Sequence, residues 1–173
     1  MIDPAYAQVM ARYNAWQNLS LYTAARNLSE EARQQDRGAF FGSIEGTLCH
    51  LAWGDLMWMS RFDGGQGARA GAFGPETASA YSWEELLTLR PKLDARIAAW
   101  AWSLSDDDLA GDLTWYSAVL KRELSKSKAL CVMHLFNHQT HHRGQVHAML
   151  TAAGARPDDT DLPFMPEEVA EWP

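Results

Sequence analysis

The feature that most restricts the fold of this chain is a run of histidines at helical spacing. Four of the six histidines lie within nine residues, and His134, His138 and His142 follow one another at intervals of four. Residues four apart lie nearly above one another on an α-helix, so these three rings share one broad face. Where such a face packs against a neighbouring helix, its polar side chains need binding partners on that helix.

Four segments show the apolar spacing of amphipathic helices. They cover residues 4–27, 43–62, 82–102 and a last stretch from Ser125 or Ser127 to Ala153. Several residues favour these ends: Asp3 before Pro4, a Ser82–Glu85 capping box, and Gly154 followed by Pro157. Pro91 lies inside the third segment and predicts a kink or an interruption there.

Between the third and fourth helical segments, residues 112–124 show a weak pattern of a short strand or hairpin. The four long segments predict an all-α fold, an antiparallel four-helix bundle with a short hairpin before its last helix. A length of 173 residues suits a single domain over residues 1–173. The glycine-rich stretch 64–79 is long for a loop, which indicates a functional or mobile segment. The sequence leaves open whether this segment covers a site.

Composition excludes several classes of protein. The formal net charge is −7 and no dense basic run exists, which argues against a nucleic-acid partner. No apolar stretch of about 20 residues predicts a membrane span, and the amino-terminal residues do not resemble a signal peptide. With only two cysteines, a disulfide-stapled secreted domain is not indicated, so we expect a cytoplasmic location.

The histidine spacing indicates a metal site. Two imidazoles four residues apart on a helix can bind one transition-metal ion, so His138 and His142 form a candidate pair. His50 is the only histidine on another predicted helix and is the candidate third ligand. Three protein ligands leave a coordination position open, as in catalytic zinc sites. Imidazole ligands suit zinc, nickel, copper and iron alike, and ordinary surface or core histidines remain the alternative.

Residues near the candidate ligands allow several interpretations. His134 could be a fourth ligand, but we favour a supporting position beside the ligands or a hydrogen-bonded core position, and we expect His141 at the surface or an interface. Gln145 could orient a ligand histidine. Arg143 could bind an anionic substrate or form a structural ion pair. Asp55 is a weaker candidate for supporting a ligand, because it lies five residues after His50.

The apolar and sulfur-containing residues have simpler interpretations. Cys49 and Cys131 are best explained as small buried side chains. Tryptophans and methionines such as Trp53, Met57 and Trp58 are best explained as core, and some of them could line an apolar pocket beside the metal.

Two strings resemble a known family. Leu135-Phe-Asn-His-Gln-Thr-His-His-Arg-Gly-Gln-Val146, with Thr47-Leu-Cys-His-Leu-Ala-Trp53 on another helix, is similar to the DinB family. The resemblance implies a four-helix bundle that holds a divalent metal through His50, His138 and His142, and it implies a homodimer. For the metal it favours zinc or nickel, with manganese or iron as alternatives.

The resemblance also suggests an activity, because related proteins include metal-dependent thiol S-transferases and an isomerase that use low-molecular-weight thiols. We therefore hypothesise an enzyme that transfers such a thiol to a small-molecule substrate. A non-enzymatic metal-binding stress-response module and a metal-dependent hydrolase remain alternatives, as does a structural bundle whose histidines bind metal only incidentally. The sequence assigns no general base and no cofactor-binding residue beyond the three candidate ligands.

Overall fold

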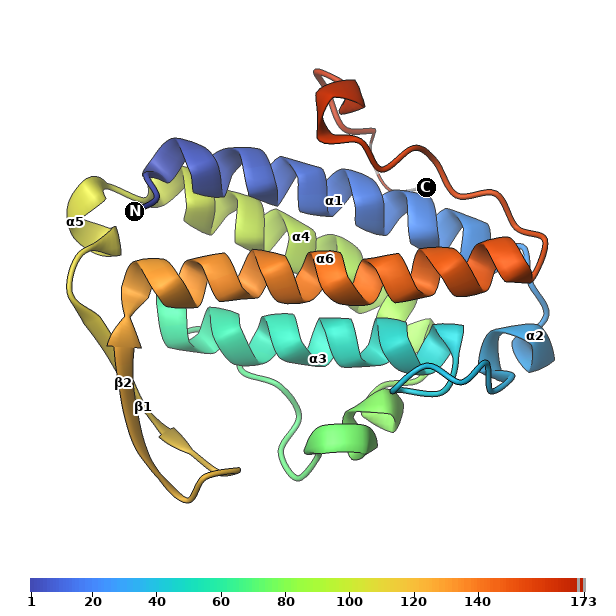
Figure 1. Cartoon of the computed structure of the whole chain (residues 1–173), viewed down its shortest axis with the longest axis horizontal. Coiled ribbons are helices and arrows are strands. Elements are labelled where there is room, and N and C mark those ends of the chain that lie inside the picture. Colours follow the sequence, from blue (N-terminus) through green and yellow to red (C-terminus); the bar gives the residue numbers. More distant parts are fainter. Residues whose placement is uncertain (171, 173) are drawn as a thin grey trace.

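The computed structural model describes residues 1–170 and 172 and is mostly helical (Figure 1). Its four long helices are α1 (Pro4–Arg26), α3 (Ile44–Asp63), α4 (Trp83–Ser103) and α6 (Lys128–Ala152). The shorter elements are α2 (Glu30–Gln34), η1 (Gly74–Ser79), α5 (Asp106–Leu109), β1 (Asp112–Ser117), β2 (Arg122–Ser127) and η2 (Leu162–Phe164). The predicted dominance of long helices is confirmed, with a small two-stranded sheet added to them.

Each long helix packs against two others. Helix α1 contacts α4 and α6, and α3 contacts the same two helices from the other side. Figure 1 shows α6 lying between α1 and α3 in that view, with α4 behind. Apolar side chains fill the space between the helices, among them Leu21, Leu48, Leu86, Leu135 and Phe136. This packing brings the histidine-bearing face of α6 beside α3.

The helices begin where the capping residues predict. The side chains of Asp3, Ser43 and Ser82 each accept a hydrogen bond from a backbone N–H of the first helical turn. Helix α4 is continuous through Pro91, so the predicted interruption is wrong. The residues around Pro91 are buried on α4, and their packing outweighs the local cost of about 3 kcal/mol that an interior proline imposes.

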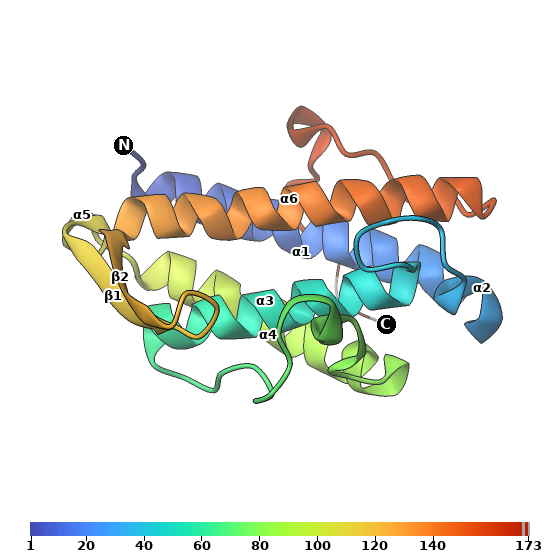
Figure 2. The ribbon, with the colours of Figure 1, turned by 60° about the horizontal axis from the view of Figure 1, so that its bottom comes forward.

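A hairpin precedes the last helix, as the sequence predicted. Strands β1 and β2 pair in antiparallel register from Asp112↔Ser127 to Ser117↔Arg122. The hairpin extends along the side of α3 in Figure 2. Its Trp115 packs edge-on against Trp58 of α3, with ring centroids 5.6 Å apart. The fold is therefore mostly helical rather than strictly all-α.

The segment after α6 returns along α1. Side chains of α1 hold it through its backbone: Arg12 donates to the carbonyls of Pro166 and Glu167, at 3.0 and 2.6 Å. Tyr13 and Gln17 donate to further carbonyls of the segment, and the Ser20 hydroxyl accepts from a backbone N–H. None of the helices in the described residues is long and apolar enough to cross a bilayer.

Candidate metal centre

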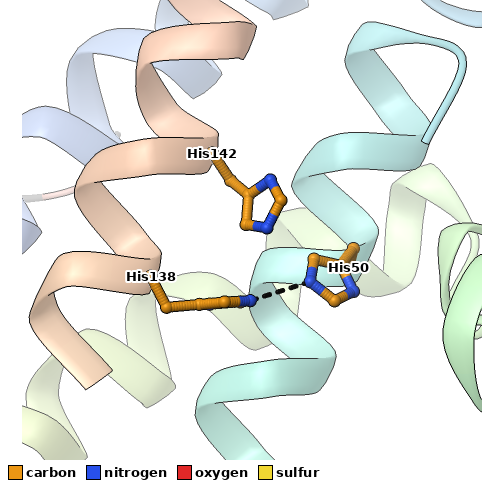
Figure 3. Close-up of side chains that lie close together, drawn as sticks. All are labelled: His50, His138 and His142. Atoms are coloured by element: carbon orange, nitrogen blue, oxygen red, sulfur yellow. Dashed lines mark hydrogen bonds between the residues drawn. The ribbon is translucent and has the colours of Figure 1, made fainter. Parts of the chain in front are cut away.

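Three histidines from two helices converge on one point (Figure 3). His50 comes from α3, and His138 and His142 come from successive turns of α6. The Nε2 atoms of His50 and His138 are 2.9 Å apart, and one ring nitrogen from each of the three residues lies within 4.8 Å of the others. The structure therefore brings together all three predicted ligands.

A glycine makes room for this convergence. Gly54 lies one helical turn after His50 on α3, and a Cβ atom there would be 3.1 Å from Cε1 of His138. Because such a distance is tighter than ordinary van der Waals contact, a larger residue would push the imidazole away from α3. Gly54 thus allows the His138 ring to lie directly against the neighbouring helix.

His50 is fixed by two neighbours from outside the long helices. Its Nδ1 lies 2.8 Å from the hydroxyl of Thr77, and that hydroxyl donates to the carbonyl of Gly74 at 2.7 Å. The Thr77 oxygen therefore accepts a hydrogen bond from Nδ1–H, which leaves the lone pair of His50 on Nε2. Phe41 stacks on the His50 ring at 3.7 Å between centroids. Both contacts orient Nε2 toward α6.

His142 is oriented in the same way by its own helix. Its Nδ1 is 2.7 Å from Oε1 of Gln145, an atom that can only accept a hydrogen bond. The proton of His142 is therefore on Nδ1 and the lone pair on Nε2. The predicted role for Gln145, to orient a ligand histidine, agrees with this contact, and such partners commonly support metal-bound histidines.

His138 has an unsatisfied ring nitrogen. Its Nδ1 is buried and has no hydrogen-bond partner within the described residues, while its Nε2 faces Nε2 of His50. In the metal-free protein the proton of neutral His138 is therefore on Nε2 and is donated to Nε2 of His50, and a bound cation would replace that proton. Since the surrounding donor set consists of neutral imidazoles, these residues fit a divalent transition metal such as zinc or nickel.

The electrostatics keep the rings neutral. Burial, together with the smaller effect of the neighbouring imidazoles, lowers the pKa of His50 to about 4 and of His138 to about 3. Burial also lowers the pKa of His142, and the Gln145 hydrogen bond opposes that shift. A metal ligand must be the unprotonated imidazole, so the site is prepared for binding well below neutral pH.

The spacing of the nitrogens is close to that of a metal-bound triad. Zinc–nitrogen bonds of about 2.0–2.1 Å in tetrahedral geometry place ligand nitrogens about 3.3 Å apart. The His50–His138 separation is slightly shorter than this and the widest separation is longer. Small rotations of the three rings would therefore equalise the distances without movement of the helices.

The other histidines of α6 lie outside the triad. His134 is exposed, and its ring packs edge-on against Trp58 at 5.1 Å, so the predicted core position is wrong. The same ring lies 5.7 Å from that of His138, which agrees with the other favoured alternative, a position beside the ligands. His141 is exposed, as expected for a surface position.

Arg143 and Asp55 take part in a buried polar cluster on the opposite side of α6. Arg143 donates to the side-chain oxygens of Asn14 and Gln139 rather than forming the predicted ion pair or facing the triad. Asp55 accepts from Gln139 and from Arg90, the latter at 2.8 Å. The interpretation of Asp55 as support for a metal ligand is therefore wrong.

Both cysteines are free and buried, as their interpretation as small apolar side chains predicted. Burial raises the pKa of each thiol, so neither is activated as a nucleophile.

Three residues that shape the triad were missed from the sequence. Thr77 and Phe41 lie outside the long helices, and Gly54 carries no chemistry of its own. The glycine-rich segment gave a partial signal for Thr77, because a long connection in a compact fold is commonly functional. No spacing rule indicated Phe41, which is separated from His50 by the start of α3.

The fold and the site together define a mostly helical domain with a candidate metal centre between two long helices. The sequence matches the model of the DinB family over residues 1–172. It is also 28% identical over 162 residues to Protein DinB of Bacillus subtilis (strain 168), covering 90% of this chain and 91% of that protein. The chain belongs to the DinB family.

Proposed function

We propose that this protein is a metal-dependent enzyme whose triad of His50, His138 and His142 holds a divalent transition metal. The observation that carries the proposal is the convergence of the three ring nitrogens, two of them with lone pairs directed inward by Thr77 and Gln145. Within the same proposal, the four long helices form an antiparallel four-helix bundle in a single domain. The free cysteines are compatible with the expected reducing cytoplasm, and the family resemblance suggests a homodimer.

For the reaction, we infer transfer of a low-molecular-weight thiol to an electrophilic small molecule. A divalent cation lowers the pKa of a coordinating thiol, so that the thiolate forms at neutral pH. Three neutral imidazoles leave the double positive charge of such a cation uncompensated, which favours an anionic ligand in the open position. Gln139 stands after His138, where the H-E-x-x-H metalloproteases have the glutamate that acts as general base, so this chain lacks that base.

The residues of this chain have defined tasks in that reaction. Thr77 and Gln145 hold two imidazoles by their Nδ1–H groups, and Phe41 limits the movement of the His50 ring. The proton of the thiol passes to solvent at the half-buried rim of the triad. The sulfur electron pair then forms the bond to the electrophilic carbon, and the leaving group departs with the electrons of the bond that breaks.

Metal content tests the first part of the proposal. Untagged protein should contain about one equivalent of metal per chain, measured by inductively coupled plasma mass spectrometry. His138→Ala should lose it, whereas His141→Ala, which removes an exposed histidine of the same helix, should retain it. Far-UV circular dichroism would confirm that both variants keep their helices. Wild-type protein that stays metal-free after exposure to zinc and nickel would refute both the metal site and the enzyme.

Turnover with monochlorobimane tests the second part. The thiol sulfur would displace chloride from the probe, and the fluorescent thioether would report the rate with glutathione, bacillithiol or mycothiol in separate reactions. Metal-loaded wild type should exceed the uncatalysed rate with at least one thiol, and His142→Ala should not. One equivalent of metal without turnover on any thiol would favour the non-enzymatic metal-binding module instead.

A further inference from the structure

A pocket of about 540 Å³ lies along α3 on the side of the triad. Trp53, Met57 and Trp58 of α3 form one wall. The glycine-rich segment 67–74 and the hairpin around Trp115 form the others. A volume of this size suits a ligand as large as a typical drug molecule. The pocket is thus built from the two connections that leave the helical body beside α3 in Figure 2.

The pocket lies on the face of α3 that also carries His50. His50, Trp53 and Met57 follow at intervals of three and four residues, so they share one face of α3. On α6, the ring of His134 lies between Trp58, at 5.1 Å, and His138, at 5.7 Å. The triad itself does not line the pocket, and His134 lies between the two.

The charge of the pocket is opposite to that of the whole protein. The chain has 22 acidic and 15 basic residues, yet the described lining contains no Asp or Glu and has two arginines, Arg61 and Arg69. Arg69 already has an anionic partner, because its guanidinium lies 2.7 Å from the carboxylate of Glu85. Arg61 has no ion pair and donates no side-chain hydrogen bond to any residue that the structure describes.

Arg61 is held in a defined position without such a partner. Its guanidinium lies over the rings of Trp58 and Trp115, 4.6 and 5.1 Å from their centroids. The ring faces attract the cation but leave its N–H donors, which point outward along the guanidinium edge, free. Burial lowers the pKa of Arg61. A guanidinium nevertheless stays charged in proteins.

We propose that this pocket binds an anionic organic molecule, with its carboxylate on Arg61 and its apolar body among the tryptophans. Arg61 lies eleven residues after His50, about 16 Å along the helix, and its long side chain lies back over Trp58. A molecule of that length would place its other end at the triad. The proposal names the substrate class of the proposed enzyme and rests on that function only for this last step.

Binding can be tested on the metal-free protein, which separates the pocket from the metal site. Dansylglycine carries a carboxylate and an aromatic body, and its methyl ester is a neutral match. Chelator-treated wild type should bind dansylglycine at least about tenfold more tightly than the ester, the advantage expected of a charge-assisted hydrogen bond. Energy transfer from tryptophan to the dansyl group would report proximity to the indoles. Equal affinity of the two probes, or no binding of either, would overturn the proposal.

Variants then assign the anion to Arg61. Arg61→Met should weaken dansylglycine binding at least about tenfold and leave the affinity of the ester unchanged, because Met keeps an apolar stem. Arg122→Met, which removes an exposed charge from the hairpin outside the pocket, should change neither affinity. If Arg61→Met does not fold, Arg61→Lys serves instead, with part of the preference for dansylglycine retained. Equal loss for Arg61→Met and Arg122→Met would refute the role of Arg61.

Discussion

Helices α3 and α6 carry two polar clusters on opposite sides, and the clusters differ in how their groups are paired. The closed network consists of Asp55, Arg90, Asp94 and Gln139, and one guanidinium bridges its two carboxylates: Arg90 lies 2.8 Å from each of them. The triad instead consists of three neutral imidazoles, two of which share one hydrogen bond between their Nε2 atoms. His138 of the triad and Gln139 of the network are adjacent in sequence.

This difference separates a structural cluster from a candidate binding site. Buried polar groups that stabilise a fold find partners within the protein, as Asp55 does with Arg90 and Gln139. Neutral imidazoles that converge on one point can instead offer their lone pairs to a metal ion, which displaces the shared proton. The two clusters therefore predict opposite responses: the closed network should respond to mutation, and the triad should respond to metal.

The largest effect should follow from opening the closed network. Arg90→Met would leave two buried carboxylates without their cation, which commonly costs about 3–5 kcal/mol in the free energy of unfolding. Urea unfolding of the metal-free protein, followed by circular dichroism, would measure it. Arg96→Met breaks a more exposed pair with Asp63 and should cost about 1 kcal/mol or less. A smaller loss for Arg90→Met than for Arg96→Met would contradict the structural role.

The next effect should appear when metal is added. Metal at about 100 times its Kd should stabilise the wild type by about 2.7 kcal/mol, seen as a higher Tm. His50→Ala should show almost no such increase, because it removes the only ligand from α3. The exposed His141 provides the control, and His141→Ala should respond like wild type. An equal rise in Tm for His50→Ala would mean that the metal binds elsewhere.

A smaller effect should come from the partner of His50. Thr77→Val keeps the shape of the side chain but removes the oxygen that accepts from Nδ1. Metal affinity, measured by equilibrium dialysis, should fall about 10- to 100-fold, as for other residues that orient metal-bound histidines. Thr151→Val removes a hydroxyl that donates to a backbone carbonyl far from the triad, and its affinity should be that of wild type. Unchanged affinity in Thr77→Val would exclude this orienting role.

The smallest effect is expected from moderate acidification. Three unperturbed histidines with pKa values near 6.5 would lose about a thousandfold in metal affinity between pH 7.5 and 5.5. Here burial holds the pKa of His50 at about 4 and of His138 at about 3, and lowers that of His142. His50 and His138 stay largely neutral over that range, so the protonation of His142, whose pKa is also lowered, should reduce the affinity by less than about tenfold. Half-release of the metal near pH 6.5 in dialysis would show that the rings titrate normally.

The lowered pKa values of His50 and His138 also make the stability of the metal-free protein depend on pH. Between pH 6.5 and about 4, the unfolded chain binds protons on His50 and His138 that the folded, metal-free protein does not. The free energy of unfolding of the metal-free protein should therefore decrease as the pH falls through this window.

Much of the fold was predictable because local rules apply to long helices. Capping residues such as Asp3 and Ser82 set helix starts, and the spacing of His138 and His142 indicated one face of one helix. The helix that supplies the third ligand was also predictable, because His50 is the only histidine on another predicted helix. The continuity of α4 through Pro91 did not follow, because it depends on tertiary packing that no local pattern records.

The surroundings of the triad were much less predictable. Thr77 reaches His50 from a 3₁₀ turn 27 residues away in sequence, and Gly54 acts only through the space that it leaves. The ion pair of Arg90 with Asp55 joins α4 to α3 across the interior. Such contacts depend on how the helices are placed relative to one another. Helical periodicity predicts which residues share a face of a helix, but not which other element packs against that face.

The carboxy-terminal segment on α1 has a consequence for how this protein can vary. The hydrogen bonds that hold it run from Arg12, Tyr13 and Gln17 to backbone carbonyl oxygens, which every amino acid has. Substitutions among residues 158–167 should thus be tolerated, whereas deletions that shift the register of the segment would misalign the carbonyls with their donors. Homologues can be expected to conserve the length of this segment more strictly than its amino-acid sequence.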